Sequence, residues 1–265
     1  MSDNHRTQRL AHAHKRTVRE DLSSQKRVMI TGAGRGLGLE FVRQYLTRGD
    51  LVFATVRDPG RLTGLADLQQ TFGPQLIVVR LDVTKPQSID AAVARVAASA
   101  SRLDILINNA GINAMSRDID DAISAARLGH LDIGVMPHMY QVNALGPLMV
   151  TQSALAMLKR GIDPRVINIS SWKGSTTDKR RGDDYGYSAS KAALNMITRA
   201  LSLDLNRDAI AVVAIDPGWV STDMGGPNAP LTPTDSVQHI IHLIDQLTND
   251  HTGQFLRWNG QQLSW

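Results

Sequence analysis

The sequence contains no cysteine at all. Disulfide bridges, zinc–thiolate sites, iron–sulfur clusters and thiol nucleophiles are therefore excluded. It also has no apolar run that approaches the roughly 20 residues a membrane-spanning helix needs. The first 25 residues lack an apolar stretch of the signal-peptide type, so we expect a cytoplasmic protein that inserts in no membrane.

Excess charge of one sign is confined to the beginning of the chain. Residues 1–27 carry seven basic and three acidic residues, an excess that equals the whole net charge of +4. The remainder is balanced, so the high isoelectric point does not indicate a nucleic-acid partner. We interpret residues 1–25 as a basic N-terminal extension that is solvated or packs on a neighbour. Contact with an anionic partner is the alternative.

The chain has 265 residues, 42% hydrophobic and 20% charged, which is enough for one large core. Short β-branched runs alternate with longer segments of helical spacing. The runs predict strands at residues 28–31, 51–56, 76–81, 105–108, 166–170 and 211–215. Helices are expected at roughly 38–48, 86–99, 138–159, 188–206 and 234–247.

This alternation predicts one α/β domain over residues 26–265, with a doubly wound, predominantly parallel sheet and helices on both faces. The strands are apolar nearly throughout, as in sheets covered on both sides. Ligands of such sheets bind beyond the carboxyl ends of the strands. Loops are expected at 173–184 and 223–233, and residues 116–134 fit either a loop or a short helix.

The first expected strand leads into a glycine-rich turn, Thr31-Gly32-Ala33-Gly34-Arg35-Gly36-Leu37-Gly38. Glycines let the backbone turn sharply and approach a pyrophosphate without an intervening Cβ. The N-terminus of the following helix offers unpaired N–H groups and a partial positive charge to the anion. An ordinary tight turn is the alternative. The residues expected to bind a dinucleotide here are Gly32, Gly34, Arg35, Gly36 and Leu37.

The charge after the second expected strand indicates which dinucleotide binds. An NAD site usually has an acidic residue there for the ribose 2′-hydroxyl, whereas this sequence has Val56 followed by Arg57. Arg57 and Arg35 together suit a 2′-phosphate through charge-assisted pairing. We therefore predict NADP(H) rather than NAD(H). Asp58 is the counter-argument, since a register slipped by two residues would place an acid at the NAD position.

A tyrosine and a lysine four residues apart, Tyr187 and Lys191, lie where a helix is expected to begin. Residues at this spacing share one helical face. A nearby ammonium favours the phenolate, so we expect Lys191 to lower the pKa of Tyr187 from its ordinary value of about 10. Such a pair supplies a proton donor beside a cation, although the spacing alone also fits an exposed helical pair.

Polar residues follow or flank the later strands. Ser170 and Ser171 end the strand that precedes Tyr187, and a hydroxyl there can hydrogen-bond a substrate carbonyl oxygen. Asn143 lies within the long expected helix 138–159, where an amide usually faces solvent. Trp219, after the sixth strand, is interpreted as packing rather than as a platform for substrate.

Together these motifs resemble a short-chain dehydrogenase/reductase of the classical type, over residues 27–265. The glycine-rich turn is similar to the Thr-Gly-x-x-x-Gly-x-Gly pattern of that family. The segments 217–230 and 255–265 resemble its C-factor and sniffer-type carbonyl reductase branch. The resemblance implies a Rossmann fold and hydride transfer between NADP(H) and a carbonyl or secondary alcohol. It also implies a homodimer or homotetramer formed through two long central helices, where Ala192, Ala193, Leu194 and Ile197 fit such a contact.

The resemblance further implies roles for individual residues. Tyr187 is the general acid in carbonyl reduction, and Lys191 tunes it. Ser171, with Ser170 as the alternative, stabilises the charge on oxygen, and Asn143 holds a water that links Lys191 to bulk solvent. Further cofactor contacts are implied for Asp82, Val83, Asn109, Ala110, Gly111, Pro217, Gly218, Val220 and Thr222.

Two other functions stay open: an NADP-binding signalling or sensor protein with little turnover, and an NAD-linked alcohol dehydrogenase. The complete set of Ser, Tyr, Lys and Asn favours an enzyme, and the two arginines argue against NAD. No metal site is expected, and a small-molecule carbonyl or alcohol is the expected partner. The walls of its site are expected from residues 112–115, 173–184 and 223–233.

Overall fold

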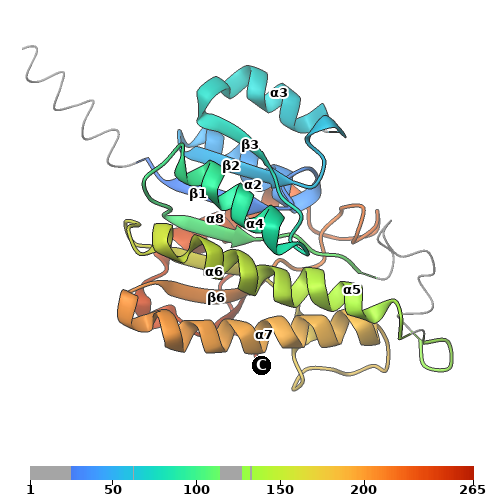
Figure 1. Ribbon diagram of the computed structural model, residues 1–265. Helices are drawn as coiled ribbons and strands as arrows, with labels where there is room; N and C mark the ends of the chain where they lie inside the picture. The colour runs from blue at the N-terminus through green and yellow to red at the C-terminus, as the bar shows by residue number, and fades with distance from the viewer. Residues whose placement is uncertain (1–24, 62, 114–126, 132) are drawn as a thin grey trace, which may run out of the picture.

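The computed structural model describes residues 25–61, 63–113, 127–131 and 133–265, so the predicted N-terminal extension lies almost wholly outside the described residues. Seven strands form one parallel sheet in the order β3-β2-β1-β4-β5-β6-β7 (Figure 1). The predicted doubly wound, parallel α/β sheet is confirmed. The strands are β1 Arg27–Thr31, β2 Leu51–Val56, β3 Leu76–Arg80, β4 Ile105–Asn108, β5 Arg165–Ile169, β6 Ala211–Asp216 and β7 Phe255–Arg257.

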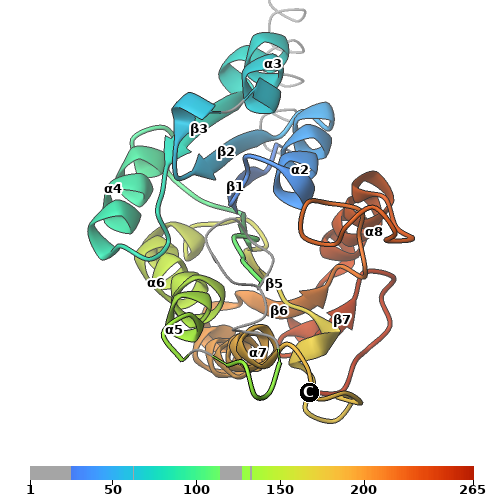
Figure 2. The ribbon, with the colours of Figure 1, turned by 90° about the vertical axis from the view of Figure 1, so that its right-hand side faces the viewer.

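Helices cover both faces of the sheet (Figure 2). One face carries α2 Gly36–Thr47, α3 Thr63–Phe72 and α8 Pro233–Gln246. The other carries α4 Pro86–Ala97, α5 Met136–Tyr140, α6 Gly146–Leu158 and α7 Tyr185–Leu205. Short 3-10 turns occur at Pro59–Arg61, Gly73–Gln75, Trp172–Gly174, Asn206–Asp208 and Asn249–His251. None of the described helices is long and apolar enough to span a membrane.

The strands are buried on both faces because their alternate side chains enter different cores. Ile30 of β1 packs with Phe41 of α2 and Ile240 of α8 in one cluster. Met29, its neighbour in sequence, packs with Ile89 of α4 and Val150 of α6 in the other. Successive side chains of a strand point to opposite faces, so a sheet covered on both sides requires the nearly continuous apolar runs seen in the sequence.

Two elements were missed at the sequence level. The helix α3 was not predicted, although Leu65 and Leu68 repeat at helical spacing and are buried. The strand β7 is only three residues long and extends the sheet beside β6. A run this short carries too little periodicity to be recognised without its partner strand.

The long helix expected at 138–159 is interrupted by a π-helical turn at Gln141–Leu145. Pro147 has no N–H to donate to the carbonyl of Asn143, four residues earlier. Within the turn, the N–H of Gly146 donates to the carbonyl of Gln141, five residues earlier. π-turns of this kind are frequent at functional sites, and here the turn contains Asn143.

Candidate active site

The predicted site residues lie at one edge of the sheet, because the carboxyl ends of parallel strands meet there. The glycine-rich turn joins β1 to α2, and residues 109–111 follow β4. Ser171 follows β5, and Pro217 follows β6. The first turns of α7 add Tyr187 and Lys191 to this edge.

The glycine-rich turn packs closely against the loop after β4. A Cβ on Gly32 would lie 2.8 Å from Ala110 Cα, and one on Gly38 would lie 2.2 Å from the carbonyl oxygen of Gly32. No side chain fits at either position. These two glycines are therefore required by the packing of the two loops, in addition to any ligand.

Hydrogen bonds tie the same two loops together. Thr31 Oγ1 accepts from the backbone N–H groups of Asn109 and Ala110, both at 3.0 Å. The side-chain amide of Asn109 donates to the carbonyl of Thr31 at 2.9 Å and to that of Gly32 at 3.2 Å. The sequence patterns gave Thr31 no role, although it is the last residue of β1 and opens the glycine-rich motif.

The N-terminus of α2 suits an anion. Arg35 is the N-cap residue, its side chain makes no capping hydrogen bond, and no acidic residue stands in the first turn. The helix therefore keeps unpaired N–H donors and its partial positive charge for an outside group. Leu37 and Gly34 are partly buried beside it.

Ser171, Tyr187 and Lys191 converge at the carboxyl end of β5. The Ser171 hydroxyl lies beside the phenol of Tyr187 and lowers the pKa of that phenol. The ammonium of Lys191 lies 5.8 Å from the centre of the Tyr187 ring and donates to the carbonyl of Ile169 at 2.7 Å. Ser170, the alternative to Ser171, instead donates to Asn195 Oδ1 at 2.6 Å and is buried. The geometry thus brings Ser171, not Ser170, to the tyrosine.

Asn143 is fully buried and does not face solvent. Its Oδ1 accepts from the N–H of Ile112 at 2.8 Å, and its Nδ2 donates to the carbonyl of Ile112 at 2.8 Å. Nδ2 also lies 2.9 Å from Ser190 Oγ, which donates to the carbonyl of Tyr187. A Cβ on Gly111 would lie 3.5 Å from Asn143 Oδ1 and 3.7 Å from Lys191 Nζ. The amide therefore connects the loop after β4 with the Tyr187–Lys191 turn of α7.

The pKa shifts correct one expectation. Burial raises the pKa of Tyr187 above its ordinary value, and the hydrogen bond with Ser171 offsets only part of that rise. Burial also lowers the pKa of Lys191 to about 8, against the opposing effect of Asp216. The prediction that Lys191 lowers the pKa of Tyr187 is wrong for this structure, because desolvation of the phenolate is the largest effect.

The loop after β6 lies against the glycine-rich turn. The methyl group of Thr222 would be 3.5 Å from a Cβ on Gly36, and Arg35 forms an ion pair with Asp223. Val220 forms an isolated bridge with Leu231. The carbonyl of Pro217, beside Gly218, accepts from Ser236 Oγ at 2.8 Å. This anchoring holds the Pro-Gly turn at the edge of the site.

The chain matches the family model described as short chain dehydrogenase over residues 26–230. The chain belongs to the short-chain dehydrogenase family. Its members are oxidoreductases.

Similar proteins indicate which branch of the family this short-chain dehydrogenase resembles. It is 40% identical over 163 residues to the C-signal protein of Myxococcus xanthus, a match that covers 62% of this chain and 93% of that protein. The NADPH-bound carbonyl reductase from chicken fatty liver superposes with a TM-score of 0.82 at 36% identity, covering 91% of this chain and 99% of the other. The carbonyl reductase Sniffer of D. melanogaster gives 0.83 at 30% identity, covering 91% and 100%. The resemblance to the C-factor and sniffer branch is confirmed.

The other end of the predicted cofactor site lies at β2 and β3. Arg57 follows β2, and Asp82 follows β3. Burial disfavours the charged form of Asp82, but hydrogen bonds from Thr84 and the charges of Lys85 and Arg57 outweigh it and lower its pKa. The carboxylate of Asp82 accepts from the N–H and hydroxyl of Thr84 at 3.0 and 2.7 Å. Val83 is buried against Gly146 of α6. The contacts of Asp82 and Val83 with an adenine ring stay a prediction.

The expected walls of the substrate site differ in their charge and exposure. Lys179 is paired with Asp183 and Lys173 with Asp184, so much of this charged run is neutralised within its own loop. Trp219 is 55% exposed, and its indole N–H donates to the carbonyl of Gly225 at 2.7 Å, so the interpretation of this side chain as packing stays a prediction. Residues 114–115 lie outside the described residues, and so does most of the stretch 116–134.

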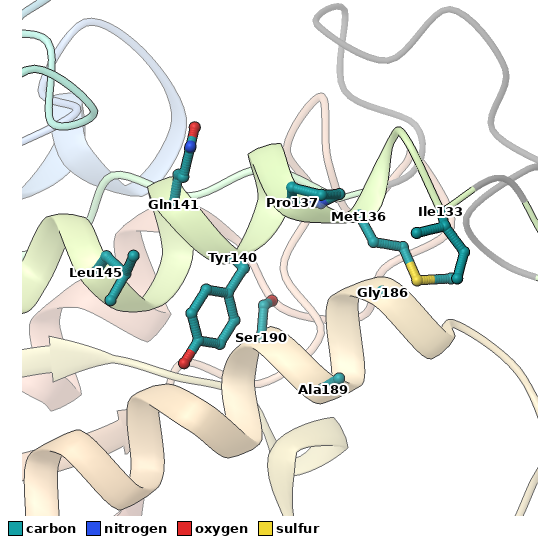
Figure 3. Close-up of a pocket in the computed structure, with 9 residues that line it drawn as sticks. All are labelled: Ile133, Met136, Pro137, Tyr140, Gln141, Leu145, Gly186, Ala189 and Ser190. Carbon is teal, nitrogen blue, oxygen red and sulfur yellow. The ribbon is translucent and has the colours of Figure 1, made fainter.

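An apolar pocket lies on the outer side of this site, between α5, the π-turn and α7 (Figure 3). Its volume is about 420 Å³. Tyr140 and Leu145 line it from one side, and Gly186, Ala189 and Ser190 line it from α7. Because Ser190 also bonds Asn143, the pocket backs directly onto the hydrogen bonds that hold Tyr187.

Proposed function

We propose that this protein is an NADP(H)-dependent reductase that transfers hydride between nicotinamide and a carbonyl or secondary alcohol. One observation carries the proposal: the Ser171 hydroxyl lies beside the Tyr187 phenol, with the Lys191 ammonium 5.8 Å from the centre of the same ring. All three lie at the carboxyl edge of a parallel sheet whose first turn is built for a pyrophosphate. An NADPH-bound carbonyl reductase among the similar structures supports the same activity.

The residues at the glycine-rich turn fit a dinucleotide. The uncapped N-terminus of α2 would receive the pyrophosphate, and Arg35 and Arg57 would receive the 2′-phosphate. The strand β2 ends in the buried Val56, so no acid stands at the usual NAD position. Asp58 accepts from the N–H of Gly60 at 3.0 Å, a local bond within its own turn. When bound, the cofactor supplies the hydride.

The phenol of Tyr187 suits the role of general acid in reduction. Its pKa is raised, so it holds its proton at neutral pH until an alkoxide develops on the substrate oxygen. Ser171 donates a hydrogen bond to the same oxygen and stabilises its charge. Lys191 places a positive charge beside the tyrosinate that proton transfer leaves behind. Asn143 fixes the α7 turn and supports the route by which Tyr187 regains a proton.

The similarity to a protein named C-signal supports a second candidate, a signalling protein whose dinucleotide site is used for binding rather than turnover. The two functions differ in what they require of Tyr187. A sensor needs the glycine-rich turn but no proton donor. Loss of activity without loss of cofactor binding, on removal of the phenol, separates them.

A panel of aldehydes and ketones, with NADPH consumption followed by absorbance, tests the proposed function. We expect turnover of at least some carbonyls with NADPH, and a higher KM for NADH. An absence of turnover across the panel, with NADPH bound, would favour the sensor. Efficient use of NADH equal to that of NADPH would contradict the cofactor assignment.

We also propose that the protein forms a homo-oligomer through α7. Among the residues predicted for this contact, Leu194 is buried and Ala192, Ala193 and Ile197 are only partly exposed. The outward face instead presents Met196, 70% exposed, and Leu203, 64% exposed. Large apolar side chains gathered on one helix are typical of a protein–protein contact.

A further inference from the structure

Asp216 is a buried carboxylate at the candidate site to which neither the sequence motifs nor the mechanism above gives a task. It is the last residue of β6, directly before the Pro217–Gly218 turn, and it is 1% exposed. A carboxylate this deeply buried is costly unless charge and hydrogen bonds compensate it. Its partners therefore indicate what it holds together.

The carboxylate of Asp216 connects the ends of three neighbouring strands. Its Oδ1 accepts from the backbone N–H of Trp172 at 3.1 Å, in the segment after β5. The backbone N–H of Gly218, just beyond β6, lies near the same carboxylate and lowers its pKa. Arg257, which is paired with Asp216 in the β6–β7 register, places its Nε 3.6 Å from Oδ2.

The segment that carries Ser171 is thus held at both ends. At its start, the ammonium of Lys191 donates to the carbonyl of Ile169 at 2.7 Å. At its end, Asp216 receives the N–H of Trp172, the residue next to Ser171. Between these anchors, the Ser171 hydroxyl lies beside the Tyr187 phenol and accepts from the N–H of Lys173 at 3.2 Å.

We propose that Asp216 is a positioning residue whose carboxylate, by fixing the backbone beside Ser171, sets the Ser171 hydroxyl against Tyr187. The proposal deepens the reductase function proposed above and rests on it for its catalytic consequence. Asp216 touches no reacting group, so it acts through Ser171. By holding Gly218 as well, it keeps the serine segment and the Pro-Gly turn of the expected cofactor site in a fixed relation.

The charge of Asp216 adds a second, measurable effect. The charged and titratable groups around Tyr187 are Lys191 on its own helix, Asp184 just before that helix, and Asp216 on β6. Asp216 raises the pKa of both Tyr187 and Lys191. Arg257 is the cation that partly offsets it. Removal of the carboxylate charge should therefore move both pKa values downward.

Amide hydrogen exchange tests the anchoring without any assay of activity. In Asp216→Ala the amide of Trp172 loses its acceptor, and we expect it to exchange faster than in the wild-type protein. The matched control is Asp104→Ala. Asp104 is equally buried and bonds two backbone N–H groups and Arg102, but it precedes β4 at the opposite edge of the sheet. Unchanged exchange at Trp172 in Asp216→Ala would overturn the proposal.

Kinetics of Asp216→Asn test the consequence for the reaction. We expect kcat for carbonyl reduction to fall about tenfold, less than the roughly 10²–10³-fold loss from deleting an oxyanion donor. In the pH–rate profiles, the alkaline limb of carbonyl reduction and the acid limb of alcohol oxidation should both move to lower pH, by roughly half a pH unit or more. Asp104→Asn should move neither limb. A loss of rate with both limbs in place would show that Asp216 is merely structural, and would overturn the proposal.

A second variant covers the case in which Asp216→Asn does not fold. Arg257→Gln keeps the carboxylate and removes its cation, so both limbs should move to higher pH. If neither limb of the pH–rate profile moves in this variant, the proposal is likewise overturned. If the wild-type protein reduces no carbonyl, the proposed function fails, whereas the exchange of the Trp172 amide still decides whether Asp216 anchors the serine segment.

Discussion

The guanidinium of Arg35 donates to the carboxylate of Asp223 at 2.7 Å, and so links the glycine-rich turn to the loop after β6. The side chains are 56% and 69% exposed, so the pair contributes little to stability. The pair matters because Asp223 and a bound cofactor would compete for Arg35. Arg35 is also a residue expected to pair with a 2′-phosphate, and Asp223 occupies part of its donor capacity.

Replacement of Asp223 by Asn should therefore improve NADPH binding. We expect the KM for NADPH to fall about two- to fivefold, since an exposed ion pair of this kind is worth only a fraction of 1 kcal/mol. The KM for NADH, which has no 2′-phosphate, should stay unchanged. Arg35→Ala is the companion variant and should raise the KM for NADPH alone. An equal change for both cofactors in either variant would contradict the pairing of Arg35 with the 2′-phosphate.

Tyr187→Phe should remove the general acid and leave the fold intact, because the ring is kept. We expect kcat for carbonyl reduction to fall by roughly 10²–10⁴-fold, with the dissociation constant of NADPH little changed. Tyr185→Phe is a matched control, since Tyr185 lies two residues earlier in the same helix and is exposed. Full activity in Tyr187→Phe would refute the assignment of the proton donor.

Replacement of Lys191 should raise the stability of the protein but abolish its activity, because the ammonium of Lys191 is buried. Its folded pKa of about 8 lies below the ordinary 10.5, so the charged form destabilises the fold at neutral pH. This cost is fully present below pH 8 and disappears as pH rises from about 8 to 10.5. Lys191→Met should thus be more stable than wild type at pH 7, by about 1 kcal/mol after loss of the bond to Ile169.

Thermal or urea unfolding of the wild type and of Lys191→Met at pH 7 and pH 10 measures this difference. The advantage of the variant should shrink at the higher pH, while carbonyl reduction should be lost at both. In the wild type, reduction should decline above about pH 8, as Lys191 loses its proton. A variant less stable than wild type at pH 7 would show that the ammonium is not a destabilising group.

Gly38→Ala should disrupt the glycine-rich turn. The added methyl group would lie 2.2 Å from the carbonyl oxygen of Gly32 and 2.6 Å from the side-chain amide of Asn109, so backbone must move. We expect a loss of several-fold or more in NADPH affinity and a lower midpoint of thermal unfolding. Gly60→Ala provides the control, because its nearest contact would be 3.4 Å away, at Asp58. Isothermal titration and thermal unfolding of both variants give the comparison.

Met196→Glu should weaken the proposed oligomer. A charge on the exposed apolar face of α7 is unfavourable only if a second copy covers that face. Sedimentation of the wild type should give a dimer or tetramer, and the variant should shift toward the monomer. Gln70→Glu places the same charge on the exposed surface of α3 and should change nothing. A monomeric wild type would refute the proposal directly.

Local patterns were enough to predict most of the sheet. The six strands expected from β-branched runs lie within one residue of their observed bounds, because strands buried on both faces must be apolar throughout. The glycine-rich turn was visible for a similar reason, since a close approach of two loops excludes any side chain at Gly32 and Gly38. The pairing of Tyr187 with Lys191 needed only the helical repeat.

Other features of the site were not visible because they depend on residues far apart in the chain. Asn143 was assigned from the family resemblance, but its inward position follows from a π-turn and from bonds to Ile112 and Ser190. The exposure of Trp219 and the partners of Asp216 likewise depend on which loops meet at the edge of the sheet.

The amino-acid order alone contains the periodicities of the strands and helices, the glycine-rich turn and the four-residue spacing of Tyr187 and Lys191. Each of these depends only on neighbours within one turn or one strand. Only the folded structure decides which serine reaches the Tyr187 phenol, and whether the pKa of that phenol rises or falls. Proton affinity in a buried site follows from desolvation and from charges brought together in space. The contact between Arg35 and Asp223 joins residues 188 positions apart, and no local pattern contains it.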